Sequence, residues 1–105
     1  MNKEELLKAA LDAVTSRGSA YGDAYTNHKR IADLWSVILD APVRADQVAP
    51  MMVALKLARL IETPSHQDSY VDIAGYAATG SQVMSVKKHD DMYECKDWVA
   101  KVKGD

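Results

Sequence analysis

Residues 55–76 read LKLARLIETPSHQDSYVDIAGY, and this stretch decides the fold. Apolar residues recur at helical spacing on both sides of Thr63-Pro64-Ser65-His66, a segment whose proline and small polar residues predict a turn. Two helices joined by so short a connection pack against each other in opposite directions. The stretch therefore predicts a helical hairpin that carries charged residues within apolar segments.

The same periodicity divides the rest of the chain into further helices. The pattern predicts helices over residues 3–14, 24–39, 45–61 and 67–83, and an amphipathic helix over about 89–103. No segment shows the sustained alternation of a strand. The expected fold is all-α, a compact bundle of four to five helices.

Several local features refine these boundaries. Two nearby glycines, Gly18 and Gly22, predict a loop over residues 16–23, since each weakens a helix by up to about 1 kcal/mol. Pro50 lacks an amide donor and predicts an irregular first turn in the helix that contains it. The helix over residues 24–39 is expected to bury one apolar stripe, with Trp35 as its main core anchor. That stripe consists of Ile31, Leu34, Trp35 and Ile38.

Composition limits the classes of protein that the chain can belong to. Its 105 residues suit a single domain, 1–105, and 48% apolar with 27% charged residues is typical of a globular protein. A net charge of -2 without a local basic patch argues against binding of duplex nucleic acid. The single cysteine, Cys95, and the lack of a signal peptide or long apolar run predict a cytoplasmic protein without membrane contact.

Two acidic residues in the fourth predicted helix form a candidate site. Asp68 and Asp72 are four residues apart, so their carboxylates lie on one helix face and can share a divalent cation such as Mg²⁺ together with water and phosphate oxygens. The alternative is structural. In that case the positive end of the helix dipole stabilises the charge of Asp68, while Asp72 pairs with Lys56 or Arg59 across the hairpin.

Basic residues in the third predicted helix supply possible anion ligands. Lys56 and Arg59 are three residues apart and share a helix edge, where they can hold phosphate oxygens or close an ion-pair network. Arg59 is the better phosphate ligand because its planar fork bonds two oxygens at once. His66, just before the fourth helix, can cap that helix, bind a metal or transfer a proton.

Other polar and aromatic residues extend the candidate site. Asn27 and His28 are expected as polar tips that line a pocket near Ile31, although a solvated helix start explains them equally well. Tyr76 is a candidate for stacking on a base or ring, but tyrosine also packs half-buried with its hydroxyl in water. Asn27 and Tyr76 complete the set of candidate ligand-binding residues with Lys56, Arg59, His66, Asp68 and Asp72.

A combination of short motifs resembles a family of small phage and prophage proteins of uncharacterised function. The resemblance covers about residues 6–80 and implies a phage origin and a compact helical domain, without a settled activity. The residues that carry it are Tyr21-Gly22, Asn27, Ile31-Ala32-Asp33-Leu34-Trp35-Ser36, Val48, Met51-Met52, Leu55-Lys56-Leu57-Ala58-Arg59-Leu60, Pro64, His66 and Asp68-Ser69-Tyr70-Val71-Asp72-Ile73-Ala74-Gly75-Tyr76-Ala77.

The chain is also similar, more weakly, to the all-α nucleoside triphosphate pyrophosphohydrolases of the MazG type. Their motif pairs a Glu-x-x-Glu run with a later Glu-x-x-Asp run that binds magnesium and the triphosphate. Asp68 and Asp72 are the counterpart of the later run with a different spacing, whereas Lys56 and Arg59 stand where the first glutamates belong. This departure favours binding of a phosphate-bearing ligand over its hydrolysis.

Two classes of function follow. The first is a protein that binds a nucleotide or other phosphate-bearing ligand, possible hydrolysis included, so the residues leave open whether it is an enzyme. The second is a non-catalytic phage interaction or anti-defence protein that inhibits a host factor or sequesters a signalling nucleotide. Either version is expected to act in the host cytoplasm as a homo-oligomer. The expected seam of that oligomer is Met92, Cys95, Trp98 and Val99.

Overall fold

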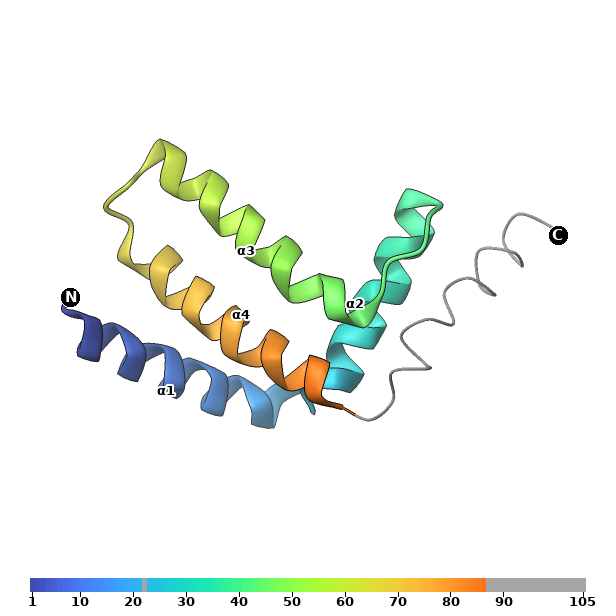
Figure 1. The fold of residues 1–105 in the computed structure, drawn as a ribbon, viewed down its shortest axis with the longest axis horizontal. Coiled ribbons are helices and arrows are strands. Elements are labelled where there is room, and N and C mark those ends of the chain that lie inside the picture. The colour runs from blue at the N-terminus through green and yellow to red at the C-terminus, as the bar shows by residue number, and fades with distance from the viewer. Residues whose placement is uncertain (22, 87–105) are drawn as a thin grey trace, which may run out of the picture.

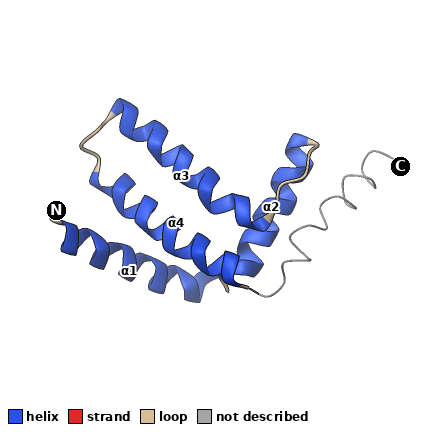
Figure 2. Ribbon diagram, in the orientation of Figure 1, coloured by secondary structure: helices blue, strands red, loops and turns tan. Residues whose placement is uncertain are grey.

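The computed structural model of the protein describes residues 1–21 and 23–86 (Figure 1). Within these ranges the chain forms helices and no strand (Figure 2), so the predicted all-α class is confirmed. The helices are α1 (Lys3–Tyr21), α2 (Ala24–Leu39), α3 (Ala45–Glu62) and α4 (Gln67–Ser85). The amphipathic helix predicted over 89–103, with its expected oligomer seam, lies outside the described residues.

Helix α4 is the centre of the arrangement. It lies between α1 and α3, and its most extensive contacts are with α3, its antiparallel partner in the predicted hairpin (Figure 1). Helix α2 packs across the end of this layer at which α3 begins and α4 ends. No helix within the described part of the chain combines the length and apolar character needed to cross a membrane.

Two boundary predictions are wrong. Helix α1 continues through Gly18 to Tyr21, so most of the predicted loop over 16–23 is helical. A glycine lowers helix stability by only about 1 kcal/mol, and packing of one helix face usually outweighs intrinsic propensity. Helix α3 is likewise regular from Ala45 and contains Pro50, so its first turn is not irregular.

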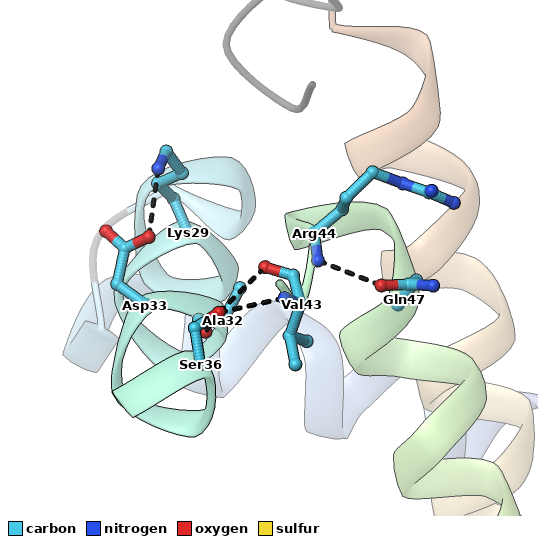
Figure 3. Close-up of polar contacts among 7 residues, drawn as sticks. All are labelled: Lys29, Ala32, Asp33, Ser36, Val43, Arg44 and Gln47. Atoms are coloured by element: carbon cyan, nitrogen blue, oxygen red, sulfur yellow. Dashed lines mark hydrogen bonds and ion pairs between the residues drawn. The ribbon is translucent and has the colours of Figure 1, made fainter. Parts of the chain in front are cut away.

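The start of α3 is stabilised by its own side chains despite the proline. The Arg44 backbone N–H donates to Oε1 of Gln47 at 2.9 Å (Figure 3), which is one half of a capping box. The Arg44 guanidinium also donates from Nε to Oδ1 of Asp46 at 3.0 Å. Pro50 removes a single amide donor near the helix start, where these bonds hold the first turn in place.

Ser36 joins α2 to the segment that leads into α3. Its hydroxyl donates to the carbonyl oxygen of Ala32 at 2.7 Å and accepts from the backbone N–H of Val43 at 2.8 Å (Figure 3). Ser36 is buried, so both bonds are shielded from water. Asp40 ends α2 in the left-handed conformation, with φ 50°, and directs the chain back toward Ser36.

The core of the described residues consists mainly of small side chains. Ala32, Val43 and Val48 form one buried cluster at the α2–α3 junction, against which Trp35 packs half-buried. The predicted stripe on α2 is wrong for two of its members, because Leu34 is 64% exposed and Ile38 is 78% exposed. Helix α2 turns its Ala32 and Ser36 face inward instead, which the Ser36 bonds require.

Small residues in α4 allow it to pack closely against the neighbouring helices. A Cβ atom built at Gly80 would lie 2.8 Å from Cβ of Ala49 in α3, closer than real Cβ atoms approach each other. A Cβ at Gly75 would lie 3.4 Å from Cγ1 of Val14 in α1, which is ordinary contact. The two glycines therefore differ in what a methyl group would meet.

Replacement of Gly80 by alanine is expected to destabilise the protein by about 1–3 kcal/mol, because α3 and α4 must move apart to admit the methyl group. Gly75→Ala is the matched control, since alanine favours a helix over glycine by about 1 kcal/mol and meets no clash. Urea denaturation monitored by circular dichroism measures the change in the free energy of unfolding for both variants. Equal effects of the two substitutions would contradict this close contact.

Candidate functional site

A cavity of about 780 Å³, partly open to solvent, lies between the four helices. Its apolar lining comes from every helix, and its polar lining comes mainly from α2 and α4. The apolar members include Val14, Ile31, Val48, Met52 and Val71. The polar members include Thr15, Asp23, Asn27, His28, Asp72, Tyr76, Thr79 and Gln82. A mainly apolar hollow with a few polar groups is typical of a small-molecule site.

The sequence-predicted residues divide into those inside the cavity and those outside it. Asn27, Asp72 and Tyr76 line it. Lys56 lies beside it, because its Nζ is 3.1 Å from Oδ2 of the lining residue Asp72. The other three candidates, which are Arg59, His66 and Asp68, do not line it.

The ion pair between Lys56 and Asp72 connects α3 to α4. Both side chains are about one-fifth exposed, at 18% and 21%, so water screens their attraction only in part. This is one of the two pairings, with Lys56 or with Arg59, that the structural alternative predicted for Asp72. Because Asp72 also lines the cavity, the pair places a cation next to the space that a ligand would fill.

Asp68 and Arg59 lie on the exposed surfaces of their helices. Asp68 is one turn before Asp72 in α4, as its spacing requires. Among the described residues, no group of three or more histidine, cysteine or acidic side chains gathers in a way that could hold a metal ion. A magnesium ion on Asp68 and Asp72 would therefore take most of its ligands from water and phosphate oxygens.

His66 caps helix α4. Its Nδ1 accepts from the backbone N–H of Ser69 at 3.2 Å and lies 2.8 Å from the Ser69 hydroxyl. Capping was one of the three roles that the sequence allowed for this histidine. The contact satisfies a donor of the first helical turn.

His28 is the cavity residue whose environment the sequence did not reveal. It is only 4% exposed, and its Nδ1 is buried without a hydrogen-bond partner among the described residues. Its position beside Asn27 predicted a polar tip near a pocket, but no pattern in the sequence indicated so complete a burial. Thr79 and Gln82 were also missed, although both follow Gly75 and Tyr76 at helical spacing along the same face of α4.

Burial lowers the pKa of His28 below its ordinary value of 6.5, because desolvation disfavours the charged imidazolium. The unfolded chain therefore binds a proton more readily than the folded protein below about pH 6.5. The stability contributed by neutral His28 is fully present above that pH and is lost as the pH falls.

Thermal unfolding measured from pH 7.5 down to pH 5 is expected to show this loss in the wild-type protein. In His28→Phe the part of the pH dependence that comes from His28 disappears, so the melting temperature falls less over the same interval. His66→Asn is the control, because asparagine is a good helix cap and His66 does not line the cavity. An unchanged profile in His28→Phe would show that His28 does not titrate in this way.

Lys56→Met is expected to destabilise the protein, because it removes the cation that pairs with the half-buried Asp72. The expected loss is about 1–3 kcal/mol, between the values for exposed and for fully buried ion pairs. Arg59→Met removes the same charge from an exposed position and should change stability by less than about 0.5 kcal/mol. Chemical denaturation compares the two. Similar losses in both would argue against a specific Lys56–Asp72 bond.

Comparison with known proteins identifies the family. The model of a domain of unknown function, DUF6378, matches residues 5–84. The Gene 55 protein of Mycobacterium phage L5 is 50% identical over 62 residues, and that of Mycobacterium phage D29 is 41% identical over 61 residues. Each match covers 58% of this chain but 40% of the relative. No solved structure matches the chain significantly. The predicted resemblance to uncharacterised phage proteins is thus confirmed, and the chain belongs to the DUF6378 family.

Proposed function

We propose that the protein binds a nucleotide or a related phosphate-bearing small molecule at the interhelical cavity. The observation that carries the proposal is the position of Lys56 next to a cavity of about 780 Å³, which lies within the roughly 300–1,000 Å³ range of small-molecule sites. A nucleotide joins a flat, partly apolar ring to an anionic phosphate group. The cavity accommodates the ring, and the neighbouring cation binds the phosphate group.

The phosphate group is assigned to Lys56 and Arg59. Arg59 follows Lys56 by three residues in α3, so both lie on the same side of that helix. Arg59 is exposed and its guanidinium is open to bidentate contact with phosphate oxygens. Lys56 would exchange part of its contact with Asp72 for contact with the ligand.

Magnesium is the proposed cofactor of this binding mode. Asp68 and Asp72 share one side of α4, and a Mg²⁺ ion keeps several waters while it bridges one or two carboxylates to phosphate oxygens. The described residues bring no third carboxylate to this position. For that reason binding is proposed in preference to MazG-like pyrophosphohydrolysis, which needs a fuller set of acidic ligands.

Calorimetric titration with nucleoside triphosphates and cyclic dinucleotides, with and without Mg²⁺, tests the proposal. At least one of these ligands should bind and be recovered intact by chromatography. Arg59→Met should weaken binding at least 10-fold, since it removes a charge-assisted phosphate contact. Arg30→Met, at an exposed site on α2 outside the cavity, is the matched control.

Other outcomes of that titration are equally clear. Cleavage of a bound ligand that disappears in Asp72→Asn would establish hydrolysis in place of simple binding. Failure of every ligand to bind would refute the nucleotide proposal in both its forms.

The second candidate function is a phage interaction protein that acts on a host factor. Its support is a group of exposed apolar side chains in the second half of α2, because contiguous apolar surface marks docking sites. The group consists of Leu34, Val37, Ile38 and Leu39, each more than half exposed. The same surface could instead be used for self-association. Sedimentation at increasing protein concentration distinguishes a homo-oligomer from a monomer, and Ile38→Glu is the variant that should prevent association through this surface.

A further inference from the structure

The position and burial of His28 are those expected of a residue that contacts a ligand. The side chain is 4% exposed and lines the cavity, while its Nδ1 has no hydrogen-bond partner within the described part of the chain. Buried polar atoms in folded proteins are almost always hydrogen-bonded, so an exception in a cavity wall calls for an explanation. Nδ1 itself is almost inaccessible from the empty cavity, so a polar atom of a bound molecule becomes its partner when the His28 ring turns toward the cavity that it lines.

The charges of the lining residues argue against phosphate as that partner. None of the described lining residues is a lysine or an arginine, and the two charged ones, Asp23 and Asp72, are both acidic. Burial keeps the His28 ring uncharged near neutral pH by lowering its pKa, so it provides one neutral donor and one neutral acceptor. An anion inside the cavity would meet Asp23 and Asp72, and the positive charge of Lys56 is already engaged by Asp72.

The remaining lining fits a flat, uncharged ring with polar edges. Asn27 lies next to His28, and its side chain has no hydrogen-bond partner among the described residues. An amide and a neutral imidazole together offer donors and acceptors of the kind that a heterocycle presents along its edge. Ile31 and Met52, which are both partly exposed, supply apolar contact for the faces of such a ring, and the flexible methionine adapts to its shape.

We propose that the cavity takes the uncharged heterocycle of the ligand, a nucleobase in chemical class, which His28 and Asn27 recognise by hydrogen bonds while the phosphates remain outside at Lys56 and Arg59. This assignment rests on the proposed function and adds the orientation of the ligand to it. It makes His28 a specificity-determining residue. Hydrogen bonding to a buried polar group discriminates strongly against analogues that lack the matching atom.

Separate titration of the two halves of a nucleotide tests this orientation. The probes are adenosine, guanosine, cytidine and uridine on one side, inorganic tripolyphosphate on the other, and the four nucleoside triphosphates as the whole ligand. We expect one nucleoside to bind without phosphate, and His28→Phe to weaken it at least 10-fold. His28→Phe should leave tripolyphosphate binding unchanged, and His66→Asn should alter neither.

The free protein gives a readout that a purely structural histidine would not give. Phenylalanine is larger than histidine, but the adjoining cavity has room for the excess and no buried nitrogen is left unpartnered, so His28→Phe should melt no lower than the wild type at pH 7.5. If that variant does not fold, the imidazole nitrogen resonances of wild-type His28 take its place. They should shift on addition of the nucleoside and stay unchanged on addition of tripolyphosphate.

Two results would overturn the inference, and they differ in what they leave standing. If tripolyphosphate binds as tightly as the triphosphates while no nucleoside binds, the ring does not occupy the cavity and the inference falls, although phosphate binding stands. If triphosphates, nucleosides and tripolyphosphate all fail to bind, the proposed function falls with it.

Discussion

The close contact between α3 and α4 is the constraint on which the rest of the structure depends. Gly80 has no side chain to hold Ala49 away, so the two helices lie closer there than two alanines would permit. This spacing brings Lys56 within 3.1 Å of Asp72 further along the hairpin. It also sets the wall of the cavity, because α4 contributes more lining residues than any other helix. Packing at one end of the hairpin thus determines the geometry of the polar site.

The size of the cavity follows from which side chains the helices turn inward. Most buried apolar residues are alanine or valine, whereas large side chains such as Leu34 and Ile61 face outward. Protein interiors are normally packed as densely as organic crystals, and an unfilled volume costs stability. Among the described residues, a cavity of about 780 Å³ that is partly open to solvent lies where such large side chains would otherwise have packed. The proposed ligand would occupy this space.

Periodicity predicted the helices better than it predicted their orientation. The bounds of α2 and the positions of α3 and α4 follow from apolar spacing and from the breaks at Asp40 and Pro64. The extension of α1 through Gly18 could not be foreseen, because tertiary packing outweighs glycine's low helix propensity. The inward face of α2 depends on the Ser36 hydrogen bonds to a distant backbone segment, and no apolar pattern records them.

Part of the candidate site was also predictable from the sequence. Hairpin geometry predicted that Asp72 pairs with Lys56 or Arg59, since residues at similar distances from a short turn face each other, and the structure shows Lys56 as the partner. Asn27, Asp72 and Tyr76 were identified from the sequence and line one cavity. The burial of His28 was not predictable, because it results from how the helices pack against one another in the assembled fold. Polar type is visible in a sequence, but accessibility depends on the assembled fold.

The hydrogen bonds of Ser36 have a consequence for how the chain can vary in length. Because this hydroxyl is bound to Val43, the segment between the two residues has a fixed length. Asp40 adopts the left-handed conformation that allows the chain to close this bond. An inserted residue there would shift α3 relative to α2 and move Val48 in the cavity wall. The exposed turn at Thr63–Ser65 lies at the opposite end of α3 and is closed by a backbone bond from the His66 N–H to the Thr63 carbonyl oxygen at 3.1 Å, while no side-chain bond across it is seen among the described residues. Extra segments are therefore accommodated at the hairpin turn, while the connection between α2 and α3 must keep its length.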